Sequence, residues 1–247
     1  YAPRAENVLV LNQMNAQQFL YEQAPSTVIL GSSLSGRIRS DLLPAGSYNL
    51  ALGGLSAWDG LAVVEASGRV PEVLWVEANV LDRPARADFA RGVITQPLRS
   101  LRAHIKSLRA VARPLTVGLS YVQAVWRRLL PVTSAAAPAR ADSVVSVEAA
   151  SDRRFAQLLE VQMQRYGKAM SDEELAAIAK SVDRLVALAD RGVRIEFFEL
   201  PVHPGLCEQA RPRRLRAWLQ ARYPDLHYRR VGRCSDVRTT DGVHLDA

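Results

Sequence analysis

Residues 73–76, with the sequence Val-Leu-Trp-Val, are the feature that most constrains the fold of this chain. Consecutive apolar residues without polar alternation are typical of a strand in a parallel sheet, where both faces are covered. Residues 26–30 and residues 47–52 form two further short runs, and each is followed by glycine. An apolar-periodic stretch from Ser56 to Val70 is typical of a helix. Strand, helix and strand therefore alternate at the spacing of βαβ units, which predicts an α/β fold with a parallel sheet.

Between about residues 87 and 192 the pattern becomes helical, and strands return after it. We predict one domain, residues 1–247, with a helical insertion at about residues 87–192 in a flavodoxin-like three-layer α/β/α sandwich. The further elements expected are helices over residues 98–112, 121–130, 151–166 and 171–190, a Pro/Ala/Ser-rich connection over residues 131–141, strands over residues 193–200 and 226–231, and a helix over residues 207–222.

The net charge of +7 admits nucleic acid, an anionic membrane surface or an acidic polysaccharide as a partner. The positive residues are mostly arginines scattered through the expected helices, which argues against a dedicated nucleic-acid groove. No run of eighteen apolar residues occurs, so these residues predict no membrane span. Because the chain opens at Tyr1, we expect it to be a processed piece whose upstream anchor or leader is not included.

Ser33 follows the first predicted strand directly and precedes a predicted helix. Backbone N–H groups at a helix N-terminus favour a developing oxyanion, but a serine hydroxyl needs a base before it acts as a nucleophile. His244 is the best candidate for that base, because Asp241 lies three residues before it and can fix the tautomer of the imidazole. Taken alone, Ser33 is equally well explained as a helix N-cap.

The chain has two cysteines, Cys207 and Cys234, and neither lies in a C-x-x-C pair or near a histidine cluster. This spacing predicts no zinc site. In an oxidising compartment the two would pair as a disulfide, and in the cytosol they would be ordinary thiols.

Four segments in order resemble the conserved blocks of the SGNH (GDSL-like) hydrolase family. These are Gly31-Ser-Ser33-Leu34, Asn49-Leu-Ala-Leu-Gly-Gly54, Glu77-Ala-Asn79-Val80 and Asp241-Gly-Val-His244. The resemblance covers residues 25–83 and 193–247. It implies that Ser33 is the nucleophile, that Asp241 and His244 complete the triad, and that Ser33, Gly54 and Asn79 form the oxyanion hole. From their residue types alone, Gly54 is explained by a tight turn and Asn79 by a loop contact.

The chain departs from the family pattern at three positions. Ser32 replaces the usual Asp, Glu77 replaces Gly, and Val80 replaces the Asp after the Asn. None is a triad or oxyanion position, so we expect the chemistry to survive in a divergent branch similar to extracytoplasmic cell-envelope members. Trp58, Asp59 and Arg83 follow the second and third blocks and are candidate lining residues of the substrate cleft.

The resemblance implies a serine-dependent acyl ester hydrolase that removes short acyl groups, acetyl first among them, from carbohydrate through an acyl-enzyme. The alternatives are an envelope-anchored polysaccharide O-acetyltransferase with the same triad and an inactive glycan-binding relative. No metal or organic cofactor is required. We expect an acylated carbohydrate or other ester as the substrate and no nucleic-acid partner. We also expect a periplasmic or otherwise extracytoplasmic location, with membrane association through an upstream segment outside this chain.

Overall fold

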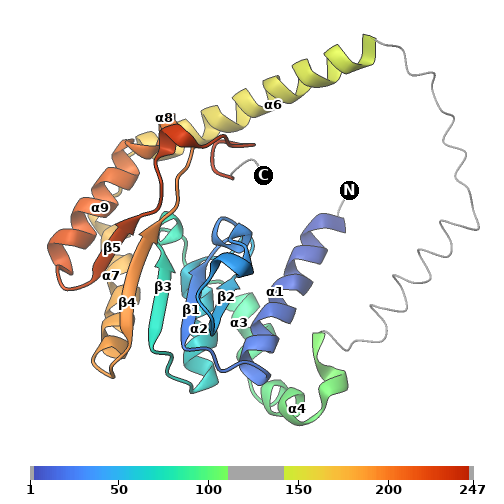
Figure 1. Ribbon diagram of the computed structural model, residues 1–247, viewed down its shortest axis with the longest axis vertical. Helices are drawn as coiled ribbons and strands as arrows, with labels where there is room; N and C mark the ends of the chain where they lie inside the picture. Colours follow the sequence, from blue (N-terminus) through green and yellow to red (C-terminus); the bar gives the residue numbers. More distant parts are fainter. Residues whose placement is uncertain (1–2, 111–141, 245–247) are drawn as a thin grey trace, which may run out of the picture.

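A five-stranded, all-parallel sheet with the strand order β2-β1-β3-β4-β5 forms the centre of the molecule (Figure 1). The computed structural model describes residues 3–110 and 142–244. This strand order is that of the flavodoxin-like doubly wound folds, so the predicted fold class is confirmed. The strands are β1 (Thr27–Gly31), β2 (Ser47–Ala51), β3 (Val73–Glu77), β4 (Arg194–Glu199) and β5 (His227–Arg230).

The register of the strands brings three predicted blocks to one edge of the sheet. Strand β1 pairs with β2 on one side, Gly31 opposite Ala51, and with β3 on the other, Leu30 opposite Val76. All three strands therefore end at the same level. The turns that follow them, which carry Ser33, Gly54 and Asn79, leave the sheet at its carboxyl edge, where open α/β sheets bind their ligands.

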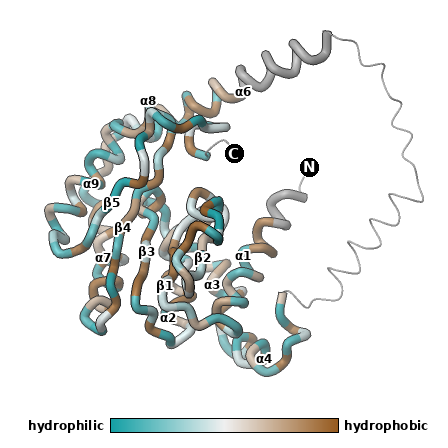
Figure 2. The backbone as a smooth tube through the Cα atoms, viewed as in Figure 1, coloured by the Kyte–Doolittle hydropathy of each residue, from teal (hydrophilic) through white to brown (hydrophobic). Residues whose placement is uncertain are grey.

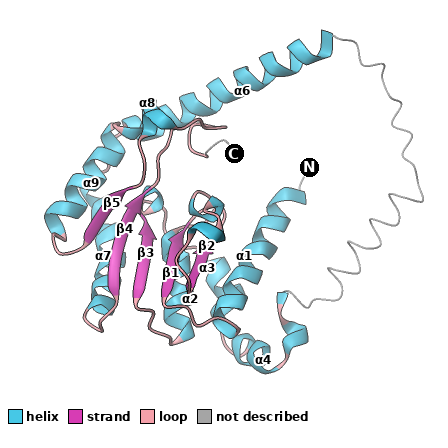
Figure 3. Cartoon of the chain, in the orientation of Figure 1, coloured by secondary structure: helices cyan, strands magenta, loops and turns pink. Residues whose placement is uncertain are grey.

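Three long helices cover one face of the sheet. They are α2 (Ala57–Ser67), α7 (Asp172–Ala189) and α9 (Ala210–Arg222), and Figure 3 shows α2 and α7 behind the strands. Val28 and Leu30 of β1 point to this face because alternate residues of a strand share a side. They pack in one buried cluster with Leu61 of α2 and Leu185 of α7. Figure 2 shows the hydrophobic stretches of the central strands that this packing buries.

A smaller apolar cluster covers the opposite face. Ile29 of β1 and Phe198 of β4 pack there against Leu34, Leu206 and Val243. Leu206 lies in the short helix α8 (Pro204–Cys207), and the other two lie in the turns before the 3₁₀ helix Ser35–Arg37 and near the end of the chain. We call the segments that pack on this face the second layer, and the segment that carries Asp241 and His244 is part of it.

The helices that come before β1 and directly after β3 in the chain gather near β2, at one edge of the sheet. Helix α1 (Pro3–Tyr21), which had no counterpart among the predicted elements, packs on α2, α3 (Ala87–Ile94) and β2. Helix α4 (Leu98–His104) is shorter than the helix predicted over residues 98–112. Arg109 explains the difference, because its guanidinium group donates to the carbonyl groups of Arg102 and Ala103 and so caps the helix end.

The remaining helices lie between β3 and β5. Helix α6 (Asp142–Gly167) extends away from the sheet, as Figure 1 shows, and α7 begins at a Ser171 capping box. The helix predicted over residues 207–222 begins only at Ala210, as α9, because Gln209 adopts an extended conformation. Cys207 instead ends the separate short helix α8. The helix and connection predicted over residues 121–130 and 131–141 lie outside the described residues. Within the described part of the chain, no helix has the length and apolarity needed to cross a membrane.

Cys207 and Cys234 form a disulfide bond with a Cα–Cα distance of 6.5 Å. The bond joins the end of α8 to the 3₁₀ helix Cys234–Asp236, which lies just before the C-terminal segment with Asp241 and His244. The sequence left the pairing of these cysteines open, and the fold brings them together.

We predict that unfolded, non-reduced protein contains no thiol that reacts with a thiol-specific reagent. The Cys207→Ala/Cys234→Ala double variant should lose about 3–4 kcal/mol of unfolding free energy, as expected for a cross-link across 27 residues. Urea unfolding of both proteins measures this difference. Two titratable thiols in the non-reduced protein would contradict the bond.

Candidate active site

Ser33 lies in the turn that leaves β1 at the carboxyl edge of the sheet. The sequence predicted a helix directly after it, but the structure has a single 3₁₀ turn, Ser35–Arg37. That turn has too few aligned peptide groups for the expected helix dipole, so this part of the prediction was wrong. Ser33 is half-buried and its hydroxyl group does not cap a helix.

The structure brings Ser33 and His244 into hydrogen-bond contact although they lie 211 residues apart in the chain. The Ser33 Oγ to His244 Nε2 distance is 2.8 Å. On the other side of the ring, His244 Nδ1 lies 2.6 Å from Asp241 Oδ2. With the Nδ1 proton donated to the carboxylate, Nε2 accepts the hydrogen bond of the serine hydroxyl, which is the arrangement a general base requires.

Asp241 is held by its own turn as well as by the imidazole. Its Oδ1 accepts hydrogen bonds from the backbone N–H groups of Val243, at 3.0 Å, and His244, at 2.7 Å. Partial burial works to raise the pKa of the Asp241 carboxyl group, but the hydrogen bonds from His244 and Val243 outweigh it and hold the pKa below its ordinary value. The carboxylate therefore stays charged at neutral pH and can stabilise a protonated imidazole.

The turn between Asp241 and His244 is fixed against the second layer. The backbone N–H of His203 donates to the carbonyl group of Gly242 at 2.9 Å. Gly242 has a φ of 87°, and a Cβ atom there would lie 2.9 Å from Leu159 Cδ1. Glycine is needed at position 242 for both reasons. Because Gly242 has no side chain, the turn can pack this closely on α6.

Gly54 lies in the turn after β2 with a φ of 71°, which favours glycine. The turn is fixed by Asn12 of α1, which accepts from the Gly53 N–H and donates to the Gly53 carbonyl group, both at 2.8 Å. Among the described residues, neither the Gly54 N–H nor the Ser33 N–H donates to another protein group. Both donors are thus uncommitted, as an oxyanion hole requires.

The side chain of Asn79 is engaged elsewhere. Its Nδ2 donates to the Leu200 carbonyl group at 3.0 Å, and its Oδ1 accepts from the Leu200 N–H at 2.8 Å. These bonds join the turn after β3 to the end of β4, which is the loop-contact role that the residue type alone suggested. Since an amide nitrogen carries two protons, one remains for another acceptor. Among the described residues, Asn79 makes no hydrogen bond to Ser33 or His244.

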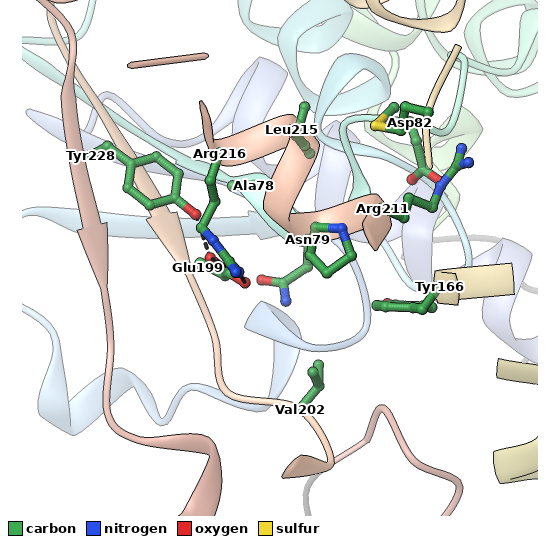
Figure 4. A pocket seen from close by; sticks show the side chains of 12 residues that line it. Ala78, Asn79, Asp82, Tyr166, Glu199, Val202, Arg211, Leu215, Arg216 and Tyr228 are labelled. Atoms are coloured by element: carbon green, nitrogen blue, oxygen red, sulfur yellow. Dashed lines mark hydrogen bonds and ion pairs between the residues drawn. The ribbon is translucent and has the colours of Figure 1, made fainter. Parts of the chain in front are cut away.

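Asn79 also lines a small cavity among α6, α9 and the ends of β3 to β5 (Figure 4). Its volume is about 30 Å³, enough for about one water molecule. Its charged groups are already paired, Arg216 with Glu199 at 2.9 Å and Arg211 with Asp82 at 3.1 Å. This cavity is therefore too small and too fully paired to hold a substrate.

Two of the three candidate cleft residues have structural roles instead. Trp58 is 2% exposed and donates from Nε1 to the Leu81 carbonyl group at 2.9 Å. Asp59, also 2% exposed, accepts from the N–H and hydroxyl groups of Ser56 in the capping box of α2. Their expected place in the cleft was wrong, because both side chains turn into the core. Arg83 is half-buried beside the third block and stays a candidate.

Glu77 is the site residue that sequence reasoning missed. It ends β3, is completely buried, and accepts hydrogen bonds from Ser32 and Ser35 on either side of Ser33. Two departures from the family pattern, Ser32 and Glu77, are therefore in direct contact, with 2.8 Å between Ser32 Oγ and Glu77 Oε1. Both departures lie in blocks that end at the same edge of the sheet. That shared location was the signal that could have predicted their contact.

In the described parts of the chain, no cluster of three or more His, Cys, Asp or Glu side chains is placed to hold a metal ion. Serine-nucleophile sites, which act by acyl transfer, have this arrangement: a serine hydroxyl is hydrogen-bonded to an imidazole, and a carboxylate orients the imidazole. Comparisons of the chain with protein-family models, with curated proteins and with solved structures found no match. The geometry and the motifs of the chain itself are therefore the basis for its function.

Asp241→Asn tests the role of the carboxylate. Asparagine keeps an oxygen acceptor for the Val243 and His244 N–H groups, but its amide group faces Nδ1 and favours the wrong tautomer of the ring. We expect kcat for hydrolysis of p-nitrophenyl acetate to fall about 10⁴-fold. Asp236→Asn, at an exposed position five residues earlier, is the matched control and should keep the wild-type rate. Unchanged kcat in Asp241→Asn would remove Asp241 from the site.

Proposed function

We propose that this chain is a serine-dependent acyl ester hydrolase of the SGNH type, which removes short acyl groups from carbohydrate. The observation that carries the proposal is the continuous hydrogen-bond chain from Ser33 Oγ through the His244 ring to Asp241. A hydroxyl group used only for packing does not need a neighbouring base whose tautomer is fixed by a carboxylate.

In the proposed reaction, His244 Nε2 takes the Ser33 proton as Oγ attacks the ester carbonyl carbon. The negative charge that develops on the carbonyl oxygen is stabilised by the N–H groups of Ser33 and Gly54, and the remaining Asn79 amide proton is the third candidate donor. Collapse breaks the bond to the leaving alcohol, which receives the proton from His244. Water then attacks the acyl-enzyme with His244 as the base, releasing the carboxylic acid and restoring Ser33.

The surroundings of Gly54 suit a short acyl group or a sugar. A hollow of about 370 Å³ lies beside this glycine between α1 and the start of α3. Its wall is apolar at Leu55 and Phe89. Arg86 and Asp88, which form an exposed ion pair with each other, supply polar groups at its rim. An apolar wall with a few polar groups is the usual composition of a small-molecule site.

An extracytoplasmic location is part of the proposal. The bond between Cys207 and Cys234 supports it, since disulfides persist in oxidising compartments such as the periplasm. The substrate we propose is accordingly an acylated polysaccharide or another ester of the cell envelope, as the resemblance to envelope members of the family implies.

A polysaccharide O-acetyltransferase is the second candidate. The His244 side chain is 30% exposed, so an acceptor larger than water has access to the base in the acyl-enzyme. A sugar hydroxyl that takes the place of water would receive the acyl group through the same two steps. Hydrolase and transferase therefore differ in the acceptor and share every residue of the triad.

Release of p-nitrophenol from its acetate ester tests the proposal. We predict that wild type is active and that Ser33→Ala is not, while Ser40→Ala, at an exposed position in the same loop, keeps the wild-type rate. Added oligosaccharide should leave the hydrolase rate unchanged. Faster release with acetylated sugar detected by mass would favour the transferase. Equal rates for wild type and Ser33→Ala would contradict both and favour an inactive glycan-binding protein.

A further inference from the structure

A buried carboxylate lies directly beneath the turn that carries Ser33. Glu77 is 0% exposed at the end of β3, and the described residues include no cation paired with it. An isolated charge in such a place is costly unless hydrogen bonds compensate it. Glu77 obtains them from the neighbours of Ser33 in the chain, which makes its position informative.

The hydrogen bonds to Glu77 bracket the nucleophile. Ser32, the residue before Ser33, donates its N–H to Oε2 and its hydroxyl to Oε1, both at 2.8 Å. Ser35, two residues after Ser33, donates its hydroxyl to Oε2 at 2.7 Å and its N–H to the same oxygen at 3.3 Å. One rigid side chain therefore holds the turn on both sides of Ser33 and takes none of the hydrogen bonds that Ser33 itself needs.

Gly31 permits this close approach. A Cβ atom at Gly31 would lie 2.5 Å from Glu77 Oε2 and 2.9 Å from Glu77 Cβ, and it would overlap the Ser35 hydroxyl group. The glycine that begins the first block therefore leaves the space that the carboxylate occupies. The Gly31, Ser32, Ser35 and Glu77 positions form one unit, which we call the Glu77 cradle.

We infer that Glu77 is a positioning residue for the Ser33 nucleophile. By fixing the N–H and hydroxyl groups of Ser32 and Ser35, it sets the direction of Ser33 Oγ toward His244 and keeps the Ser33 N–H available for the oxyanion. The inference rests on the proposed function, because positioning matters only if Ser33 reacts. A carboxylate with a purely structural role would contribute to the unfolding free energy and leave turnover of the folded protein unchanged.

Glu77→Gln separates these roles. The substitution keeps the shape, but it removes the charge and turns one acceptor into a donor that faces the donors of the cradle. We expect kcat for p-nitrophenyl acetate to fall about 10²-fold with KM unchanged, the effect of a misdirected nucleophile. Glu199→Gln is the matched control: Glu199 ends the neighbouring strand β4, is 7% exposed and accepts from Arg216 and Tyr228. That variant should lose stability and keep the wild-type kcat.

Folded Glu77→Gln with wild-type kcat would overturn the inference, and so would an equal loss of kcat in Glu199→Gln. If Glu77→Gln does not fold, Ser35→Ala decides the question. It keeps the carboxylate, removes one hydroxyl donor from the cradle, and should lower kcat by a smaller factor with KM unchanged. Wild-type kcat in folded Ser35→Ala would then overturn the inference. A wild type whose rate equals that of Ser33→Ala would instead overturn the proposed function beneath it.

Discussion

Parallel pairing of β1 with both β2 and β3 is the constraint on which the site depends. Because the three strands run in the same direction and end at one level, the turns that follow them share one edge of the sheet. Ser33, Gly54 and Asn79 come to that edge from three different stretches of chain. The buried packing of Val28, Leu30 and Leu74 sets the register, so the core of the protein also determines where its polar edge residues lie.

The proposed base, His244, lies in a segment that is far from Ser33 in the chain and has little regular structure of its own. After β5 the chain forms a short 3₁₀ helix and a turn, and no strand or α-helix is described between Arg230 and His244. Several separate constraints replace regular structure there. The disulfide between Cys207 and Cys234, the hydrogen bond from His203 to Gly242 and the buried side chain of Val243 all hold the turn to the second layer. A loop held at several points can carry a catalytic group precisely enough for a 2.8 Å contact.

Much of this arrangement could be predicted from the sequence, because it depends on local patterns. Apolar runs such as residues 73–76 identify the strands. The D-x-x-H spacing predicts that the Asp241 carboxylate reaches the His244 ring within one turn. Side-chain direction could not be predicted in the same way. Trp58 and Asp59 follow the second block, but both side chains turn into the protein. The Trp58 N–H donates to a backbone carbonyl group, and the Asp59 carboxylate belongs to a capping box. The end of α4 was missed for a similar reason, since it depends on the direction of the Arg109 side chain, which folds back and donates to the Arg102 carbonyl group.

The Glu77 cradle shows what else could not be predicted from the sequence. Glu77 and Ser32 lie 45 residues apart, and each taken alone differed from the SGNH pattern with no evident consequence. Only the register of β1 on β3 puts the buried carboxylate under the turn that carries Ser33. Contacts between strand ends depend on tertiary structure, so residues that act in pairs across a sheet edge are hard to find in a single sequence.

Covalent labelling of the purified chain with a fluorophosphonate, followed by mass spectrometry of its peptides, tests the central claim most directly. Such a reagent reacts with a serine hydroxyl that a neighbouring base has activated and leaves ordinary serines unmodified. The account predicts one adduct, on Ser33, and none in His244→Ala. Absence of an adduct at neutral and higher pH, or an adduct on a different serine, would contradict the claim that Ser33, His244 and Asp241 form a working nucleophilic site.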